Sequence, residues 1–148
     1  MTDAIAIREV DPSDAPAVTD LLTQLGYPGT APFLAERLRL FAERDEDHVM
    51  VATLDRVIVG LCALHFMPSL AHRNDFARIA YLCVSEACRG RGVGQALVRQ
   101  AEDLVRARPC DRIEVHCHAR RTRAHAFYLD LGYEESPKYF VKRLGSGP

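Results

Sequence analysis

The chain has 148 residues, close to the length of one globular domain, so we expect a single domain with a core at about residues 4–144 and a loose tail at 145–148. A composition of 48% hydrophobic and 26% charged residues excludes a disordered or fibrous protein. The formal net charge of −1 hides two halves of opposite charge. Residues 1–88 carry 7 arginines and 13 acidic residues, whereas residues 89–148 carry 12 basic and 7 acidic residues. This asymmetry indicates either charged partners or two solvated faces.

Other bulk properties exclude further classes of protein. The N-terminus lacks the basic start and apolar run of a secretory signal, and the longest apolar stretch, residues 57–64, is far shorter than the roughly 18 to 20 residues of a membrane span. We therefore expect a cytoplasmic protein that does not bind membranes. The five cysteines form no CxxC pair and are expected to be reduced and mostly buried. No Gly-Lys-Ser or Gly-Lys-Thr triplet is present, which excludes a P-loop ATPase or kinase.

The first half of the chain predicts a strand, two helices and an antiparallel meander. Apolar residues alternate in the strands and recur every three to four residues in the helices, and Asp55-Arg56 joins two apolar runs as a hairpin turn. The predicted elements are a strand at 4–10, a helix from an N-cap at Ser13 to Gly26, a helix with Leu34, Leu38 and Phe41 on one side, an acidic loop at 43–47, and strands at 49–54, 57–67 and 76–84.

The second half predicts a strand, a glycine-rich turn, a helix and a further strand. Because a helix connects these two strands, they should lie parallel in one sheet. The predicted elements are a strand ending at 82–84, a helix with the stripe 97, 101, 104 and 105 that stops at Pro109, a strand at 113–117, a helix from Ala124 that ends at Gly132, and two short strands from Tyr133 and from 139–141. The sequence thus predicts a mixed α/β domain built on one sheet.

The glycine-rich turn Arg89-Gly90-Arg91-Gly92-Val93-Gly94 is the segment that carries chemistry. A turn of this kind leaves the first N–H groups of the following helix free, and the helix dipole adds partial positive charge there. The two arginines can add forked hydrogen bonds to phosphate oxygens. The Rossmann pattern GxGxxG is not met, since Gln95 and Leu97 occupy the positions of the third glycine, and a nicotinamide dehydrogenase is therefore not expected.

This turn resembles the pyrophosphate-binding signature R/Q-x-x-G-x-G/A of the GCN5-related N-acetyltransferase (GNAT) superfamily. A second segment, from Ala124 to Tyr133, is similar to the family's A-x-x-F-Y-x-x-x-G-F/Y element. The two signatures occur in the family's order, about thirty residues apart, and the order of elements resembles the family over residues 4–144. The resemblance implies one mixed, mostly antiparallel twisted sheet flanked by helices.

The resemblance also implies the reaction and most of the site. The expected activity is transfer of an acetyl group from acetyl-CoA to a small primary amine by direct attack in a ternary complex, without a metal. Tyr128 corresponds to the general acid that protonates the leaving thiolate, although by spacing alone it equally suits a core aromatic. The expected contacts to CoA come from the strand end and the turn: Leu82, Cys83, Val84, Arg89, Gly90, Arg91, Gly92, Val93 and Gly94. GNAT proteins often form dimers, so a homodimer is also considered.

The sequence departs from the family pattern at two places. Many relatives carry a glutamate base on the fourth strand, and the aligned position here is Ala80, so His65, Tyr81, Glu114 and His118 are considered as replacements beside a mechanism that uses water alone. Relatives often place asparagine where this chain has Arg121, which we consider as a contact to the CoA phosphates or as a solvated helix start. Tyr27, His65 and Tyr81 are the candidate acceptor-binding residues.

Several other functions were weighed. His116 and His118 share one face of a strand, but no second ligand pair has zinc spacing, so no metal is expected. The arginines are dispersed without interleaved aromatic residues, which argues against nucleic-acid binding. Within the family, acetylation of a protein N-terminus or lysine is the alternative activity. A CoA-sensing module without catalysis is the alternative from another class.

Overall fold

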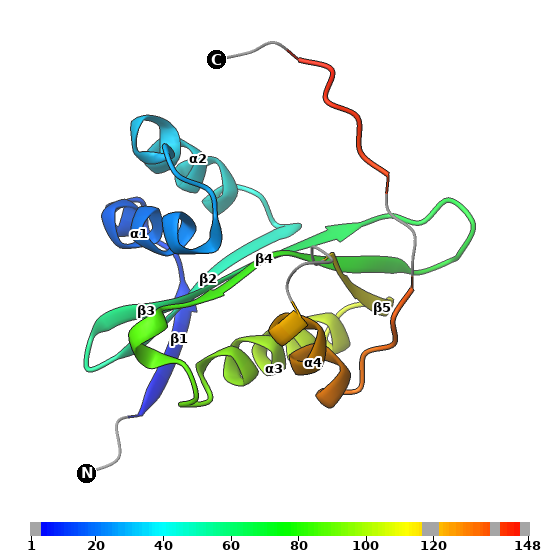
Figure 1. The fold of residues 1–148 in the computed structure, drawn as a ribbon. Coiled ribbons are helices and arrows are strands. Elements are labelled where there is room, and N and C mark those ends of the chain that lie inside the picture. The colour runs from blue at the N-terminus through cyan, green and yellow to red at the C-terminus, as the bar shows by residue number, and fades with distance from the viewer. Residues whose placement is uncertain (1–3, 117–121, 137–139, 146–148) are drawn as a thin grey trace. The chain divides into compact units, whose positions relative to one another are not determined.

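The computed structural model describes residues 4–116, 122–136 and 140–145 (Figure 1). The chain divides into two compact units, Met1–His116 and Cys117–Pro148, which are treated separately. The elements of the first unit are β1 (Ile5–Glu9), the 3-10 turn η1 (Pro12–Asp14), α1 (Ala15–Leu25), α2 (Ala31–Ala42), β2 (Asp47–Leu54), β3 (Val57–Met67), β4 (Asp75–Val84), the 3-10 turn η2 (Glu86–Cys88), α3 (Val93–Arg106) and β5 (Cys110–Val115). The second unit contains α4 (Thr122–Asp130).

The first unit is built on a five-stranded sheet in the order β1-β2-β3-β4-β5. The first four strands pair antiparallel, and β5 is parallel to β4. The turn between β2 and β3 places Asp55 and Arg56 at φ values of 49° and 67°, and such positive values suit a tight hairpin. The predicted fold class and the parallel pairing across the α3 connection are therefore confirmed.

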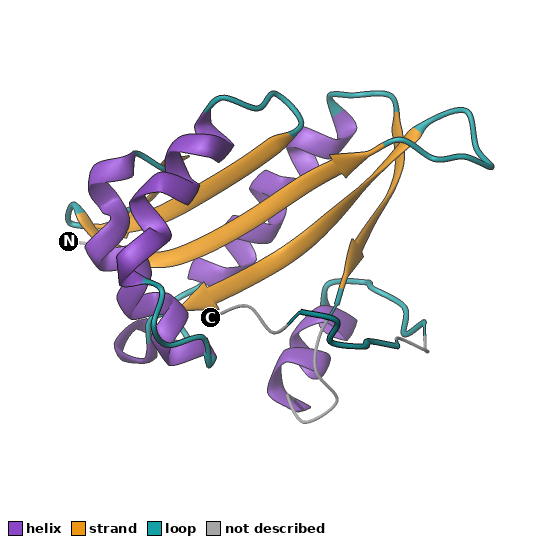
Figure 2. Ribbon diagram, turned by 90° about the horizontal axis from the view of Figure 1, so that it is seen from above, coloured by secondary structure: helices purple, strands orange, loops and turns teal. Residues whose placement is uncertain are grey.

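Helices cover both faces of this sheet (Figure 2). Helices α1 and α2 lie on one face, where their buried leucines meet alternate strand residues such as Val49, Val51, Leu61, Ala63 and Cys83. Helix α3 covers the other face with its own buried stripe, Val93, Leu97, Val98, Ala101 and Val105. The alternation of strand side chains between the two faces explains why β2 and β3 are apolar almost throughout.

The first turn of α3 packs closely on the sheet at Gly60 of β3. A Cβ atom at Gly60 would lie 2.8 Å from Cγ1 of Val93 and 3.0 Å from Cδ1 of Leu97. Gly60 is paired with Val84, the last residue of β4. The missing side chain at Gly60 therefore lets the start of α3 pack on β3 beside the end of β4. This contact positions the turn that links β4 to α3.

Two local predictions are wrong. The cap before α1 is formed by Asp11 and Asp14 rather than by Ser13: Asp11 accepts a hydrogen bond from the backbone of Ser13, and Asp14 accepts one from the backbone of Asp11. The last predicted strands are not formed at Tyr133, Phe140 and Val141, while residue 139 lies outside the described residues. An alternating apolar pattern reports strand tendency, but a strand also needs a pairing partner, which local sequence does not specify.

Candidate functional site

The glycine-rich turn links the end of β4 to the start of α3. Gly90 and Gly92 both have a φ of +83°, in the left-handed region that other residues enter at a cost. Gly92 is the N-cap residue of α3, and Gly94 already belongs to the first turn of the helix. The glycines at 90 and 92 therefore allow the chain to reverse sharply and begin the helix directly.

The start of α3 presents unused hydrogen-bond donors. No side chain caps the helix, and the first main-chain bond of this turn runs from the N–H of Ala96 to the carbonyl of Gly92 at 3.0 Å. Within the described ranges, the N–H groups of residues 93–95 have no acceptor. Arg89 and Arg91 flank these donors, are exposed, and make no ion pair with any residue that the structure describes. Free N–H groups, the helix dipole and two unpaired guanidinium groups together form a site for an anion such as a phosphate.

Strand β4 loses its parallel partner before it reaches this turn. The pairing with β5 ends at Ile79 and Val115, so residues 80–84 have no strand partner on that side among the described residues. The register with β3 also shifts here, because Ala63 pairs with Tyr81 and Leu64 pairs with Ile79, which leaves Ala80 as the extra residue of a β-bulge. The predicted CoA contacts Leu82, Cys83 and Val84 lie on this open stretch of β4, directly before the turn.

The face of the sheet under α1 and α2 carries two of the predicted acceptor residues side by side. The rings of Tyr27 and Tyr81 meet edge to face with centroids 5.3 Å apart, and both residues are partly exposed, at 47% and 38%. Tyr81 pairs with Ala63 on β3, and His65 lies two residues further along that strand on the same face. The structure thus brings together Tyr27, Tyr81 and His65 next to the bulge.

His65 forms a pair with a carboxylate that sequence reasoning had placed in a loop. Its Nδ1 lies 2.7 Å from Oδ1 of Asp47, the first residue of β2, whose side chain is only 6% exposed. The guanidinium of Arg44 bonds the other carboxylate oxygen of Asp47. Burial on its own would raise the pKa of Asp47, but the hydrogen bonds from His65 and Arg44 outweigh it and hold the pKa below its usual value. Asp47 is therefore an ionised partner for His65.

A second polar cluster follows on the same face, across β4 and β5. Arg78, the cross-strand partner of His65, donates from Nη2 to Oε1 of Glu114 at 3.1 Å, and Arg112 donates from Nε to Oε2 of Glu114 at 3.0 Å. Burial raises the pKa of Glu114, but these two arginines outweigh it and lower the pKa overall. The sequence did not single out Arg78, although its place in the alternating pattern of β4 was an available signal, and it placed Asp47 only in an acidic loop near the expected acceptor pocket.

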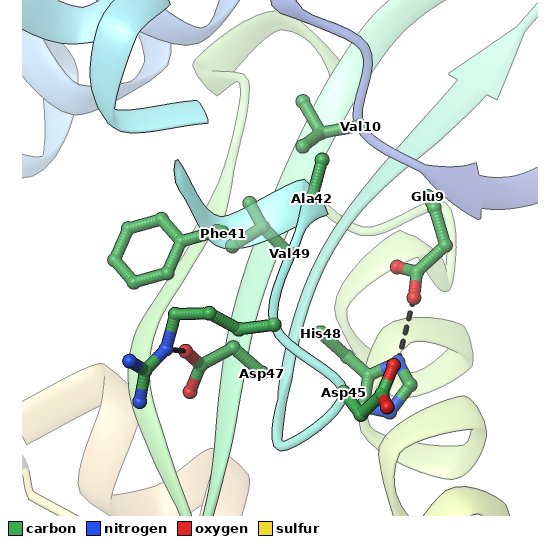
Figure 3. A pocket seen from close by; sticks show the side chains of 9 residues that line it. Glu9, Val10, Phe41, Ala42, Asp45, Asp47, His48 and Val49 are labelled. Carbon is green, nitrogen blue, oxygen red and sulfur yellow. Dashed lines mark hydrogen bonds and ion pairs between the residues drawn. The ribbon is translucent and has the colours of Figure 1, made fainter. Parts of the chain in front are cut away.

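A cavity of about 220 Å³ opens at the start of β2, near the end of α2 (Figure 3). A hydrogen bond between Nδ1 of His48 and Oε1 of Glu9, 2.6 Å long, lies on one side of it, and the Arg44–Asp47 pair lies on another. The lining residues are Glu9, Val10, Phe41, Ala42, Arg44, Asp45, Asp47, His48 and Val49. Three carboxylates and the guanidinium of Arg44 face this cavity, and two of the carboxylates, Glu9 and Asp47, are already bonded by His48 and by Arg44.

The second unit contains the predicted acid, Tyr128, on α4. The ring of Tyr128 packs against Phe127 and Tyr133 with centroid distances of 5.1 and 5.6 Å. The N–H of Tyr133 donates to the carbonyl of Tyr128 at 3.0 Å, past Gly132 at a φ of +91°, so the helix ends as its glycine predicts. Arg121 and His118 lie outside the described residues.

Neither metal ligation nor a membrane span is seen in the described parts of the chain. Residues 4–116, 122–136 and 140–145 contain no group of three or more His, Cys, Asp or Glu side chains that could hold a metal ion. None of the helices described there is long and apolar enough to cross a membrane. His116 instead lies 3.9 Å from Glu114 through its Nε2.

Comparison with known proteins identifies a family and relatives within it. The profile of the "Acetyltransferase (GNAT) family" matches residues 15–133. Among curated proteins, the aminoalkylphosphonate N-acetyltransferase of Salmonella typhimurium is 33% identical over 97 residues, which is 66% of this chain and 63% of that protein. The aligned part thus spans less than two thirds of that relative.

Two solved structures show the same fold. The crystal structure of a transcriptional regulator from Bacillus halodurans has a TM-score of 0.86 at 24% identity, over 95% of this chain and 100% of that one. An aminoglycoside N-acetyltransferase in complex with CoA has a TM-score of 0.83 at 17% identity, over 97% of each chain. At these identities, the two structures bear on the fold alone.

Proposed function

The chain belongs to the GNAT acetyltransferase family, and on this premise we propose that it transfers the acetyl group of acetyl-CoA to a small primary amine by direct attack in a ternary complex. Acetyl-CoA supplies an activated thioester whose carbonyl carbon accepts the amine nitrogen. The protein's part is to bind the two substrates side by side, to orient them and to manage two protons.

The observation that carries this proposal is the anion site at the start of α3. The unused N–H groups of residues 93–95 and the unpaired Arg89 and Arg91 match the negative charge and the acceptor oxygens of a pyrophosphate. Gly90 and Gly92 carry no side chain, and a Cβ at either would meet no atom within 4 Å, so the turn is open to a ligand. The residues present therefore fit the phosphates of CoA.

The last residues of β4 would hold the rest of CoA. The pairing of β4 with β5 ends at Ile79, so the main-chain groups of Leu82 and Val84 on that side can pair with the amide groups of the pantetheine arm. A main-chain N–H of Cys83 or Val84 would then stabilise the negative charge that develops on the thioester oxygen. The β-bulge at Ala80 opens the sheet at this point.

Tyr128 would protonate the departing thiolate. Support comes from its place in the element Ala124–Tyr133 and from α4, where the tyrosine is followed by the predicted helix end at Gly132. The phenol, with an ordinary pKa near 10, gives up its proton only to a base as strong as the thiolate. Arg121 would add a contact to the CoA phosphates.

The acceptor would bind on the face under α1 and α2. Tyr27, Tyr81 and His65 lie there beside the bulge, and the nearby carboxylates, Asp47 among them, favour a cationic amine. The name of one similar protein, the aminoalkylphosphonate N-acetyltransferase, supports a small amine over a protein lysine or N-terminus.

One experiment tests both the proposed acetyl transfer and the role of Tyr128 as general acid. Calorimetry would measure CoA binding, and a thiol reagent would follow CoA release from acetyl-CoA with a panel of small amines and peptides. We expect Tyr128→Phe to bind CoA normally and to lose most of its turnover, about 100-fold or more. Tyr133→Phe, which removes a phenol next to Tyr128, is the matched control and should stay active. Tight CoA binding with no accepted amine would indicate a CoA sensor, and a fully active Tyr128→Phe protein would remove the acid assignment.

A further inference from the structure

His65 is placed where the acceptor amine would be deprotonated. It lies on β3 on the face under α1 and α2, where its ring contacts Phe41 of α2 with centroids 5.6 Å apart. Its cross-strand partner is Arg78, and two residues earlier Ala63 pairs with Tyr81. The bulge falls between these two pairs. His65 therefore borders the point at which β4 opens toward the expected thioester.

The pairing of His65 with Asp47 fixes which ring nitrogen can accept a proton. Asp47 is buried and ionised, and an ionised carboxylate only accepts hydrogen bonds, so Nδ1 of His65 carries the hydrogen that joins them at 2.7 Å. The lone pair is then on Nε2, for which the described residues provide no hydrogen-bond partner. Arg44 holds the second oxygen of Asp47, so the carboxylate cannot turn away. This is a base oriented by a carboxylate.

The other candidates on this face are less able to accept a proton from the amine at neutral pH. Each carboxylate oxygen of Glu114 is bonded by an arginine, and its lowered pKa reduces its affinity for a proton. The phenol of Tyr81 would have to ionise before it could accept a proton, and Ala80 has no group that titrates. His118 lies outside the described residues.

We propose that Nε2 of His65 is the general base that accepts the proton of the acceptor amine, and that Asp47 is its positioning residue. The proposal rests on the acetyltransferase function given above. The amine nitrogen forms a bond to the carbonyl carbon, the carbon–sulfur bond breaks, and the thiolate leaves with its electron pair and takes a proton from Tyr128. His65 takes the proton that the nitrogen loses and releases it to water, and Tyr128 is reprotonated from water. One proton is thus released and one is taken up, so the net products are the amide and the CoA thiol.

Charged groups on several elements surround His65. Asp47 of β2 bonds it, with Arg44 beyond, and Arg78 of β4 is its cross-strand partner and pairs with Glu114 of β5. Helix α2 contributes the ring of Phe41, over which the guanidinium of Arg37 lies 5.5 Å from the ring centroid. Protonated His65 cannot accept a proton, so kcat/KM should fall on the acidic side as His65 becomes charged.

The chain contains a matched control for this pair. His48 also bonds a carboxylate, Glu9, through Nδ1 at 2.6 Å, and its side chain has the same exposure as that of His65, 22%. His48 lies one residue after Asp47 and therefore on the opposite face, where its ring meets Phe66. Replacing His48 removes the same chemical group from a place where the proposal gives it no role.

The experiment measures kcat/KM against pH for wild type, His65→Gln, Asp47→Asn and His48→Gln, with acetyl-CoA and the best small amine of the panel. Glutamine keeps a donor for Asp47. We expect His65→Gln to lose about 100- to 10,000-fold in kcat/KM at neutral pH. The acidic limb, which is the fall in kcat/KM at acidic pH that protonation of His65 causes, should be absent from this variant. Its affinity for CoA should be unchanged. Asp47→Asn can donate as well as accept and therefore no longer fixes which ring nitrogen of His65 carries the hydrogen. This variant should lower kcat while leaving KM for the amine unchanged, and His48→Gln should match wild type.

A measurement on the unmodified protein covers the case in which a variant does not fold. The His65 ring, assigned through the backbone by NMR, should titrate at the midpoint of the acidic limb in wild type. Three results would overturn the assignment of His65 while the acetyltransferase function stands. They are an acidic limb of kcat/KM that persists in His65→Gln, a loss of kcat/KM in His48→Gln equal to that in His65→Gln, and an NMR titration midpoint of His65 far from the midpoint of the kinetic limb. A wild-type protein that binds no CoA would overturn both.

Discussion

The contact between Gly60 and the first turn of α3 gives a sharp test of how the anion site is positioned. Replacing Gly60 by alanine would put a Cβ atom 2.8 Å from Cγ1 of Val93 and 3.0 Å from Cδ1 of Leu97, distances at which something must shift. Val93 and Leu97 are both buried, at 1% and 0% exposure, so neither side chain has free space to enter. We therefore expect the start of α3 to move away from the sheet, and the turn with it.

The size of the effect follows from two opposing contributions. Overpacking a filled core costs about 1 to 3 kcal/mol. The backbone of Gly60 is outside the left-handed region, so alanine also restricts the unfolded chain and stabilises the fold by about 0.4 to 1 kcal/mol. The net loss in free energy of unfolding should be about 1 to 2 kcal/mol, which lowers Tm by about 2 to 8 °C in a domain of this size.

Urea unfolding and calorimetric titration with CoA measure the two consequences. Gly60→Ala should lower both stability and CoA affinity. In the double variant with Val93→Ala, which removes Cγ1, the stability loss should be smaller than the sum of the single losses by about 1 kcal/mol. Gly29→Ala is the control for CoA affinity: its φ of +81° strains an alanine and lowers stability, but its Cβ would meet no atom within 4 Å, so it should leave CoA affinity unchanged. Strict additivity of Gly60→Ala and Val93→Ala would refute the reasoning.

Three further predictions concern single positions. Gly92→Ala should cost about 1 kcal/mol in urea unfolding through its φ of +83° and weaken CoA binding, and unchanged stability would argue against strain in the turn. The hydrogen bonds from His65 and Arg44 hold the pKa of Asp47 below its usual value, so the stabilisation that Asp47 supplies is present at neutral pH and is lost as pH falls through its folded-state pKa. In urea unfolding, the difference in free energy of unfolding between wild type and Asp47→Asn should therefore narrow as the pH is lowered into the acidic range. Burial raises the pKa of Cys62 to about 12, so a disulfide reagent at pH 8 should modify the half-buried Cys88 and spare Cys62 until the protein unfolds.

Local patterns were enough to predict most of the elements. The run 57–67 coincides with β3, and the glycines at 26 and 132 end their helices in the left-handed conformation that such residues favour. The anion site was predictable too, because the turn, the helix start and the two arginines are contiguous in the chain. Phe140 and Val141 show the opposite case, since a strand depends on a partner elsewhere that no local pattern identifies.

The acceptor face was only partly predictable, because it is assembled from four strands and a loop. Tyr27, His65 and Tyr81 were proposed singly, but their proximity depends on the β3–β4 register and on the bulge at Ala80. A shift of one residue would turn a side chain to the other face of the sheet. Asp47 appeared to belong to an acidic loop, and only its inclusion in β2 places its carboxylate against His65.

The charge asymmetry between the two halves of the chain takes on a more local meaning. Two of the twelve basic residues of the second half are seen paired inside that half: Arg106 pairs with Glu102 and Asp103, and Arg112 pairs with Glu114. Arg89 and Arg91 differ from these because they make no ion pair with a described residue and flank unused N–H groups. A net charge is screened over about 10 Å in salt, whereas an unpaired group beside a helix start acts at contact distance. The binding of an anion therefore follows from these two arginines rather than from the total of +5.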